Sequence, residues 1–472
     1  MKTTFLLISL CIFSFTSLAQ TSEKDSLSDA FHLIDIWLEA QVQYDNLPGL
    51  SVGIVKDQEL LWSKGYGYSN VEDQVAATPK TIYSICSISK LFTSIAIMNL
   101  YEEGKIRLDD PVSDHLPDFN IQQKYEESGP ITIRSILTHS SGLPREADAA
   151  YWTGPDFPFP TSEEMKDRLG KQETLYSAST YWQYSNLGMS LLGEVIEKVS
   201  GVPYDQYIED LILKPLQLNN TKTILPEDQW GRQMATGYSS LKRDGSRNVM
   251  QLFDARGIKA AAGFSSTVED LAKFSSWQFR LLKNGKEEIL KPATLKEMQR
   301  VHWVDPDFNT FWGLGFSVRQ GDGEKVVGHG GSCPGYRTNL SLTPGEEISI
   351  IVMTNSMDNP AQYGNEIAKI LKKAKGKKKA KDAPNLSPYL GMYDYQPWSS
   401  EVQVIEWYGQ LALITLPANS PSGSMTLLKH EEGDTFSWIR SDKTAGDKIT
   451  FERNASGKVT KMWRHNNAAE KL

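Results

Sequence analysis

TIYSICSISKLFTSIAIMNLYEEGK, residues 81–105, carries the strongest chemical signal in this chain. It holds Ser87 and Lys90 three positions apart. Apolar residues follow at helical spacing, at Leu91, Ile95 and Met98. This periodicity predicts a helix that Gly104 would end. A serine at the start of a helix has a free backbone amide, and a residue one turn later lies on the same face. The stretch therefore predicts a serine hydroxyl beside a lysine amine.

The S-x-x-K pattern is weak by itself, since average composition predicts about two chance occurrences in a chain of this length. It occurs as SISK at Ser87 and as SSLK at Ser239, and the second copy lies in the polar, turn-rich stretch GYSSLKRDGSRN. A serine becomes nucleophilic when a neighbouring base takes its proton. Lys90 can act as this base only if burial or nearby positive charge lowers its pKa. We predict Ser87 as a nucleophile whose own N–H stabilises an oxyanion.

Composition indicates an ordinary globular protein. The chain has 472 residues, of which 40% are hydrophobic and 23% charged, and its net charge is −8. This length predicts one large domain and one small one. Because the positive charges do not form a basic face, nucleic acid is not expected as a partner.

The N-terminus predicts a signal peptide over residues 1–19. Lys2 precedes the apolar run Phe5–Phe15, and small residues stand at Ser17 and Ala19, where we expect cleavage. The run is too short to span a bilayer, which takes roughly 20 residues. An uncleaved anchor is the alternative. We expect a periplasmic or secreted protein whose mature chain does not insert into a membrane.

Two cysteines, Cys86 and Cys333, would remain after cleavage. Export permits a disulfide between them. Two cysteines make no disulfide framework, so we favour buried packing for Cys86 and assign no role to Cys333. The chain has neither a zinc-binding Cys/His spacing nor an H-E-x-x-H motif, so no metal or other cofactor is expected.

Strand patterns lie at both ends of the first 371 residues and helical patterns lie between them. Two strands are expected within 49–68, and others from about 313 to 355. Helices are expected at 161–169, at 186–201 and from 264, the last with Ser266 and Glu269 in capping-box spacing. The predicted fold is α/β (α+β): an antiparallel sheet flanked by helices, with an inserted helical subdomain.

A domain boundary is expected after this first domain, residues 20–371. Residues 372–386 are rich in lysine and contain Pro384, which predicts a solvated linker. Attraction to an anionic surface is the alternative for this segment. Residues 387–472 alternate apolar and polar positions between turns and predict a small all-β, barrel-like domain.

Two further motifs could complete a site. Y-x-N occurs four times, but only Tyr184-Ser185-Asn186 directly precedes a helix in the helical middle of the chain. GHGGSCPGYRTN begins with His329-Gly330-Gly331 after a strand, and glycines at a strand edge let a substrate backbone lie close. The alternative is a glycine turn with a satisfied surface histidine. GLSVG at 49–53 resembles a nucleophile elbow but lacks the strand–turn–helix context, since Pro48 precedes it.

With these motifs in order, the chain resembles the serine β-lactamase and penicillin-recognising family, nearest its class C branch with its esterase and peptidase relatives. The resemblance covers roughly residues 30–370. SISK stands at the family's S-x-x-K, YSN at its Y-x-N and HGG at its K-T-G. The flanking stretches YEEGKIRLDDPV, ITIRSILTHSSGLP and GFSSTVEDLAKF also match.

The resemblance implies a role for each residue. Ser87 would attack a carbonyl and form an acyl-enzyme, with Tyr184 as its base and as donor to the leaving group, sharing the proton with Lys90. Asn186 would hold the Lys90 amine and a substrate amide. The backbone amides of Ser87 and Ser332 would form the oxyanion hole, and His329 and Gly331 would line the substrate site.

One departure concerns His329, which stands where the family has a lysine. A lysine offers fixed positive charge to a substrate carboxylate, whereas histidine is mostly neutral above about pH 6.5. This favours small amide or ester substrates, including peptides with D-residues, over a β-lactamase or D-Ala-D-Ala carboxypeptidase. A binding or sensing protein without turnover is the alternative of another class. The natural substrate, the oligomeric state and the role of the C-terminal domain stay open.

Overall fold

The computed structural model describes residues 24–321, 323–379 and 384–472. Chain contacts divide it into two compact units. One is Leu47–Gly364, and the other joins Asn365–Leu472 with the residues before Leu47. The expected signal peptide and residues 380–383 of the expected linker lie outside the described residues.

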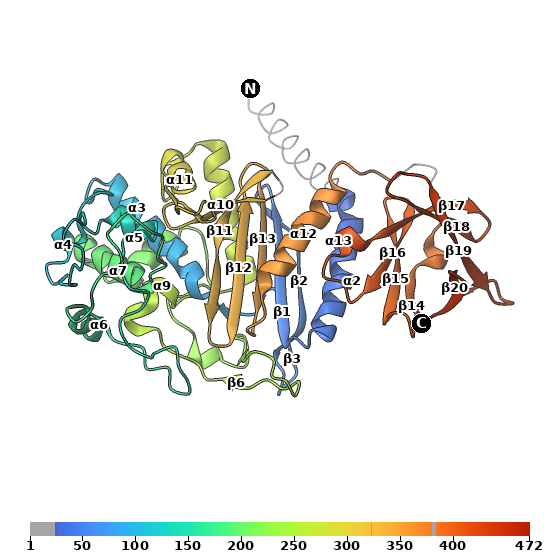
Figure 1. Ribbon diagram of the computed structural model, residues 1–472, viewed down its shortest axis with the longest axis horizontal. Coiled ribbons are helices and arrows are strands. Elements are labelled where there is room, and N and C mark those ends of the chain that lie inside the picture. Colours follow the sequence, from blue (N-terminus) through green and yellow to red (C-terminus); the bar gives the residue numbers. More distant parts are fainter. Residues whose placement is uncertain (1–23, 322, 380–383) are drawn as a thin grey trace, which may run out of the picture. The chain divides into compact units, whose positions relative to one another are not determined.

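The first unit is built on a nine-stranded sheet in the order β3-β2-β1-β13-β12-β11-β10-β9-β8, with every pair antiparallel (Figure 1). Strands from the two ends of the unit meet where Leu50 pairs with Thr354. The predicted antiparallel sheet is confirmed. Its strands are β1 (Gly49–Lys56), β2 (Glu59–Asn70), β3 (Val75–Ala76), β8 (Trp303–Val304), β9 (Phe311–Trp312), β10 (Ser317–Gly321), β11 (Glu324–Cys333), β12 (Tyr336–Thr343) and β13 (Ile348–Thr354). Two short ladders join β4 (Tyr83–Ser84) to β7 (Ser265–Ser266) and β5 (Gly237–Tyr238) to β6 (Val249–Met250).

The strand β1 is buried along almost its whole length, as expected of a central strand covered on both faces. One of its faces is covered by α10 (Val268–Asn284), which approaches so closely that a Cβ on Gly53 would lie 2.4 Å from Val268 Cγ1. The helix α10 is capped by Thr267, whose side chain accepts a hydrogen bond from the Asp270 amide at 3.1 Å. The predicted cap at Ser266 is wrong by one residue, because Ser266 pairs in β7.

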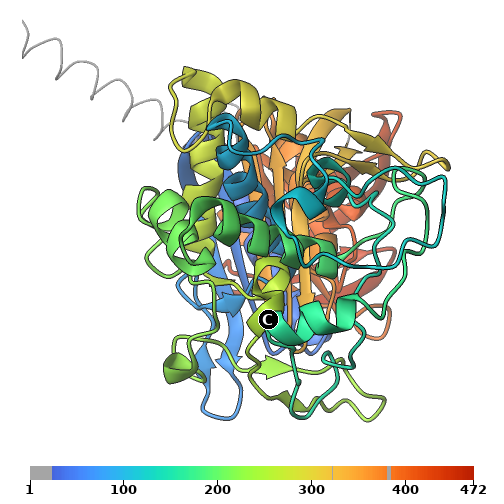
Figure 2. The same ribbon diagram turned by 90° about the vertical axis from the view of Figure 1, so that its left-hand side faces the viewer.

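The inserted helical subdomain is also confirmed, and Figure 2 views it from its own side. Its caps are local. Thr161 and Glu164 form a capping box at the start of α6, Ser185 caps α7, and Gly201 ends α7 with a left-handed φ of 72°. The α-helices of this unit besides α10 are α3 (Ser89–Glu102), α4 (Val112–His115), α5 (Ile133–Leu137), α6 (Ser162–Leu169), α7 (Asn186–Ser200), α8 (Tyr204–Ile208), α9 (Lys259–Ala262) and α11 (Pro292–Met298). Shorter turns are η1 (Cys86–Ile88), η2 (Glu209–Leu213), η3 (Glu227–Gln229) and η4 (Arg256–Ile258).

The second unit contains a closed barrel of eight strands, which confirms the predicted all-β domain. A helix that the sequence patterns did not predict, α2 (Ser28–Tyr44), is held to it through Trp37, whose Nε1 donates to the Ala418 carbonyl at 2.7 Å. The barrel strands are β14 (Gly391–Asp394), β15 (Glu401–Trp407), β16 (Gln410–Leu416), β17 (Thr426–Glu432), β18 (Thr435–Ile439), β19 (Ala445–Arg453), β20 (Val459–Arg464) and β21 (Asn467–Lys471), with η5 (Ser387–Tyr389) before them and α13 (Pro421–Ser424) between β16 and β17.

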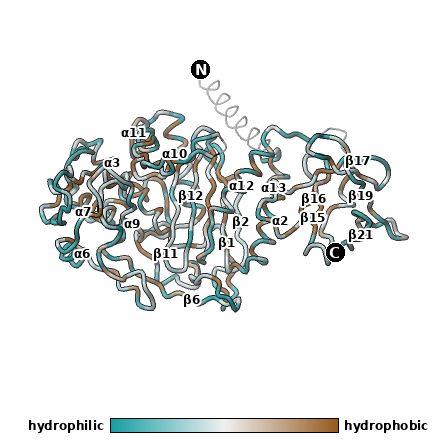
Figure 3. Tube along the Cα trace, in the orientation of Figure 1, coloured by the Kyte–Doolittle hydropathy of each residue, from teal (hydrophilic) through white to brown (hydrophobic). Residues whose placement is uncertain are grey.

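The expected lysine-rich linker begins later than predicted. Residues 372–374 form the last turn of α12 (Pro360–Ala374) instead. Lysine side chains suit the C-terminal end of a helix, because the helix dipole is negative there. No helix in the described part of the chain is both long and apolar enough to cross a membrane. In Figure 3 the hydrophobic stretches fall mostly within helices and strands, and the peripheral loops are hydrophilic.

The strand β11 extends past the end of its neighbour β10. The pairing with β10 stops at Gly328, so residues 329–333 are paired only with β12 and leave their other edge open. At this open end, Gly331 lies against η1. A Cβ on Gly331 would lie 2.3 Å from the Ile85 carbonyl oxygen and 2.3 Å from Thr338 Oγ1. The neighbouring Gly330 faces open space, where a Cβ would meet only the Thr338 carbonyl oxygen at 3.6 Å.

We therefore expect Gly331→Ala to lower the free energy of unfolding by about 1–3 kcal/mol, because β11 and η1 must move apart to admit a methyl group. Gly330→Ala is the matched control and should stay within about 0.5 kcal/mol of the parent protein. Urea denaturation of the three proteins measures the difference. Equal stability of the two variants would contradict the close approach of β11 to η1.

Candidate active site

Ser87 lies in the 3-10 turn η1, directly before α3 begins at Ser89. Cys86 starts this turn with a φ of 49°, a left-handed conformation that is uncommon outside glycine. The sequence pattern predicted Ser87 at the start of a helix, and the structure places it in the 3-10 turn that leads into α3, with Lys90 in the first turn of α3. Lys90 Nζ is 3.2 Å from Ser87 Oγ, so the predicted proximity of amine and hydroxyl is present.

The Lys90 amine is fully buried among hydrogen-bond acceptors. It donates to Asn186 Oδ1 at 2.7 Å, from the first residue of α7, and to the Ala261 carbonyl at 2.7 Å, from α9. A neutral amine has two N–H groups and one lone pair. With both N–H groups used in this way, the lone pair is left for the Ser87 hydroxyl.

Burial lowers the pKa of Lys90 well below its usual value, because a charged ammonium loses its hydration there. The positive charge of Arg145 lowers this pKa further, and the negative charge of Glu146 opposes the shift. The neutral amine is thus the favoured form over a wider range of pH than for an exposed lysine. This is the form that can accept a proton from Ser87.

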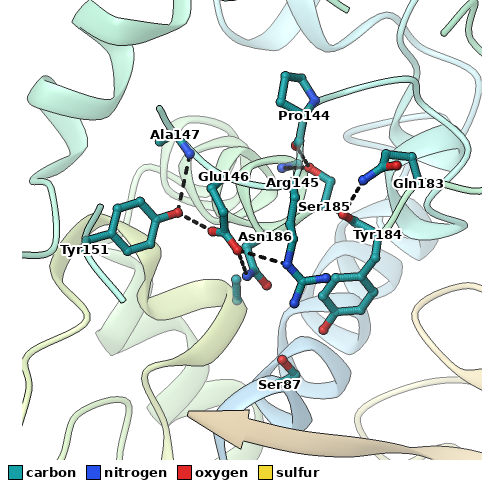
Figure 4. A network of polar contacts seen from close by, with 12 residues as sticks. Ser87, Pro144, Arg145, Glu146, Ala147, Tyr151, Gln183, Tyr184, Ser185 and Asn186 are labelled. Atoms are coloured by element: carbon teal, nitrogen blue, oxygen red, sulfur yellow. Dashed lines mark hydrogen bonds and ion pairs between the residues drawn. The ribbon is translucent and has the colours of Figure 1, made fainter. Parts of the chain in front are cut away.

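Tyr184 lies in the loop before α7, and its side chain is directed toward Ser87 (Figure 4). Two cations flank its ring: Lys90 Nζ and the guanidinium carbon of Arg145 are each 4.8 Å from the ring centroid. Burial raises the pKa of Tyr184 above its usual value, although the nearby Ser87 hydroxyl and the charge of Arg145 lower it. Tyr184 is therefore a protonated phenol at neutral pH, able to donate a proton.

Glu146 is a residue of this cluster that the motifs did not reveal (Figure 4). Its carboxylate accepts hydrogen bonds from Asn186 Nδ2 at 2.7 Å and from the Tyr151 hydroxyl, and it pairs with Arg145 Nε at 3.2 Å. A carboxylate only accepts, so it fixes which end of the Asn186 amide faces it. The Asn186 oxygen is thereby directed at Lys90. The only signal in the sequence is that Arg145 and Glu146 directly follow the stretch ITIRSILTHSSGLP.

His329 lies on β11 and is only 5% exposed. Its Nδ1 is 2.5 Å from the Gly330 carbonyl oxygen, which requires the proton on Nδ1, and no described residue bonds its Nε2. Burial lowers the pKa of His329 to about 3, and the charge of Lys90 adds to this shift. His329 is therefore neutral at physiological pH. Its ring centroid is 5.6 Å from that of Trp312 and 6.1 Å from that of Tyr184.

Cys86 and Cys333 form a disulfide with a Cα–Cα distance of 5.8 Å. The preferred sequence interpretation, separate cysteines with Cys86 merely packed, is wrong. The reason is tertiary: η1 and the end of β11 are far apart in the chain but in contact in the fold. The bridge joins the residue before Ser87 to the residue after Ser332, which is exposed on β11.

The other motif copies lie outside this cluster. The Ser239 copy of S-x-x-K follows β5 in a loop. Among the other Y-x-N copies, Tyr68 lies near the end of β2, Tyr363 lies in α12 and Tyr44 is the last residue of α2. In the described ranges, no three His, Cys, Asp or Glu side chains gather as a metal site.

The family model described as "Beta-lactamase" matches residues 34–375, a span that includes every residue of this cluster. The chain belongs to the β-lactamase family. A second model, described as "Domain of unknown function (DUF3471)", matches residues 375–470. Protein flp of Staphylococcus aureus (strain MW2) is a relative at 30% identity over 333 residues, covering 70% of this chain. The match spans 64% of that relative, so the chain covers less than two thirds of its length.

Two solved structures of similar fold are the octameric penicillin-binding protein homologue from Pyrococcus abyssi and a D-stereospecific amidohydrolase from Streptomyces sp. The first is 28% identical, has a TM-score of 0.64 and covers 93% of this chain and 99% of its own. The second is 26% identical, has a TM-score of 0.58 and covers 73% of this chain and 98% of its own.

The disulfide between Cys86 and Cys333 generates a testable prediction for this member of the β-lactamase family. Because the bridge closes a loop across a sequence separation of 247, the double variant Cys86→Ser/Cys333→Ser should lose about 2–5 kcal/mol of unfolding free energy. Urea denaturation with and without reductant measures the loss. The double variant is the control, because reductant should no longer change its free energy of unfolding. Free thiols detected in the unreduced parent protein would contradict the bridge.

Glu146 generates a second prediction. Its charge raises the pKa of Lys90, so the neutral, isosteric Glu146→Gln should lower that pKa, by about one pH unit for a nearby charge. Arg145→Ala should shift it the opposite way. NMR titration of the Lys90 amine measures both shifts. Glu297→Gln, at an exposed ion pair with Arg300, is the control that should leave the titration unchanged, and an unchanged titration in all three variants would disprove the coupling.

Proposed function

We propose that this protein is an exported serine hydrolase that cleaves small amide or ester substrates through an acyl-enzyme on Ser87, as a D-amino-acid peptidase or carboxylesterase. The observation that carries the proposal is the Lys90 amine. Its Nζ lies 2.7 Å from Asn186 Oδ1, 2.7 Å from the Ala261 carbonyl oxygen and 3.2 Å from Ser87 Oγ, so a neutral amine that donates to the first two has its lone pair left for the Ser87 proton. This is the arrangement that a serine needs to attack a carbonyl carbon at neutral pH.

The first half of the reaction acylates the serine. As Ser87 Oγ bonds to the carbonyl carbon, its proton passes to the Lys90 amine. The backbone amides of Ser87 and Ser332 donate to the resulting oxyanion. Tyr184, which the resemblance assigned both as base and as donor to the leaving group, acts here only as the donor: its hydroxyl proton goes to the leaving nitrogen or oxygen as the bond to carbon breaks. The Lys90 ammonium then returns its extra proton to the tyrosinate.

The second half releases the product by the same groups in reverse. Water takes the place of the leaving group and attacks the acyl carbon, giving its proton to the Tyr184–Lys90 pair. Ser87 Oγ leaves and regains a proton from Lys90. A protein that only binds its ligand needs neither a buried, deprotonated lysine nor a tyrosine directed at the same serine. The cluster therefore favours turnover over a sensing role.

The substrate class follows from His329. Because His329 is neutral and buried, it cannot offer a carboxylate the fixed charge that a lysine would provide at this position. This favours an amide or ester over the β-lactamase and carboxypeptidase alternatives, and similarity to a D-stereospecific amidohydrolase supports the amide side. Export is supported by the N-terminal pattern and by the Cys86–Cys333 bridge, since disulfides persist mainly in oxidising compartments.

The decisive experiment compares the two copies of S-x-x-K. A fluorophosphonate should label the parent protein and Ser239→Ala equally, because Ser239 lies in a loop outside the cluster. Ser87→Ala should take no label and lose at least about 10³-fold in kcat/KM, and Lys90→Ala about 10²–10⁴-fold. Turnover of p-nitrophenyl esters, D-amino-acid p-nitroanilides and nitrocefin then sorts the substrate classes. Label on Ser87→Ala, or turnover that survives it, would refute the proposal.

A further inference from the structure

His139 is a buried histidine beside the tyrosine that protonates the leaving group, and the proposed mechanism leaves it without a role. It follows α5 in the chain and is only 1% exposed. Its ring centroid lies 4.4 Å from that of Tyr184. Three further rings pack around Tyr184 at greater centroid distances, from 6.0 to 6.4 Å: those of Trp182, His329 and Trp312. Of these four rings, that of His139 is therefore the nearest to Tyr184.

Two hydrogen bonds tie His139 to the chain on both sides of Tyr184. The Gln183 amide donates to the His139 carbonyl at 2.7 Å, and the Ser185 amide donates to His139 Nδ1 at 3.3 Å. Only the second bond depends on the side chain. Because Nδ1 accepts this bond, the proton of the neutral ring is on Nε2. Burial lowers the pKa of His139 well below its usual value, so the ring stays neutral and Nδ1 stays available as an acceptor.

The turn that holds His139 lies along the loop that leads to Tyr184. The carbonyl oxygens of residues 139, 140 and 142 accept hydrogen bonds from the amides of residues 183, 179 and 175, at 2.7, 2.7 and 2.8 Å. His139 itself has a φ of 56°, a left-handed conformation that is uncommon outside glycine. Such conformations persist where the surrounding contacts require them, and they gather at active sites. The main-chain bonds and this conformation together keep His139 against Tyr184.

We propose that His139 is a positioning residue, whose ring and Nδ1 hold Tyr184 where its hydroxyl can protonate the leaving group. The inference rests on the proposed function and adds to it a residue that acts through Tyr184. The N–H of Ser185 belongs to the peptide unit that joins Ser185 to Tyr184. While Nδ1 holds this N–H, that peptide unit cannot turn freely, so the direction in which the Tyr184 side chain leaves the backbone is restrained. The neighbouring His139 ring restrains the phenol itself.

A role in proton donation predicts a dependence on the leaving group. An amide nitrogen must be protonated as its bond to carbon breaks, whereas p-nitrophenolate leaves as a stable anion without a proton. Displacing Tyr184 should therefore slow cleavage of an anilide and spare the matching p-nitrophenyl ester. Loss of folded enzyme would slow both substrates alike, so the ratio between them separates a positioning role from a purely structural one.

The test measures this ratio with the p-nitroanilide and the p-nitrophenyl ester of one D-amino acid. Both substrates give the same acyl-enzyme, and kcat/KM reports only the steps that form it. His139→Phe keeps an aromatic ring but removes the acceptor. It should lower the anilide-to-ester ratio by about 10²-fold, with the fall in kcat rather than in KM. His139→Asn keeps an acceptor and tolerates the left-handed φ, so it should recover most of the ratio.

His115→Phe is the matched control. It makes the same exchange at a half-buried histidine of α4, which is paired with Asp110 at 3.1 Å, and it should keep the parent ratio. Titration with a fluorophosphonate gives the fraction of active enzyme in each variant. After correction for this fraction, an equal fall for both substrates in His139→Phe, or an unchanged ratio, would overturn the role of His139.

Amide hydrogen exchange tests the same inference without turnover. The Ser185 amide should be protected in the parent protein and in His139→Asn, and His139→Phe should make it exchange faster. The Gln183 amide is an internal control, because its acceptor is the His139 main-chain carbonyl, which every variant retains. A Ser185 amide that His139→Phe leaves equally protected would overturn the inference. The expected change in exchange, in a parent protein that hydrolyses neither substrate, would leave the positioning of Tyr184 standing and overturn only the proposed function.

Discussion

The structure of the active site depends on the burial of one amine. Lys90 is removed from water, and a buried charge without a partner is far more costly than a buried neutral group. The fold meets this constraint with two neutral acceptors, the Asn186 amide oxygen and the Ala261 carbonyl. Because these come from α7 and α9, the packing of the helical subdomain around α3 is what sets the protonation state of the lysine.

The sheet contributes the other half of the site. Residues 329–333 of β11 run past the end of β10 and leave an open edge beside η1, the turn that holds Ser87. Two features keep η1 against this edge: the absence of a side chain at Gly331, and the Cys86–Cys333 bridge. The sequence suggested that glycines here let a substrate backbone lie close. In the structure Gly331 instead lets η1 pack against β11, while Gly330 faces open space.

Charge is distributed around Tyr184 differently from what the family pattern implied. The K-T-G position holds a neutral, buried histidine, and the exposed cation is Arg145, which comes from a loop of the helical subdomain. Glu146 balances this arginine and, through Asn186, orients the acceptor that faces Lys90. One carboxylate therefore links the exposed Arg145 to the buried Lys90 amine. Buried polar networks of this kind are stable only when every member is satisfied.

The local features were predictable. The helices α6 and α7, the two strands within 49–68 and the alternating strands of the barrel depend on short-range spacing, and the structure bears them out. The errors also have local causes. The cap of α10 lies one residue later than predicted because Ser266 pairs in β7, and the linker starts later because α12 runs to Ala374. The helix α2 gave no cap signal: no side chain caps its first turn.

By itself, the sequence determined that Ser87 and Lys90 would face each other, since three positions along a helical turn bring two side chains together in any fold. The sequence also set where the copies of the S-x-x-K and Y-x-N motifs stand along the chain. Only the tertiary structure decided which copies of them meet: it placed Tyr184 rather than Tyr44, Tyr68 or Tyr363 against Ser87, paired two cysteines 247 positions apart, and brought Arg145 and Glu146 to the site. The physical reason is that such contacts join segments distant in the chain, and their geometry exists only after the helices have packed on the sheet.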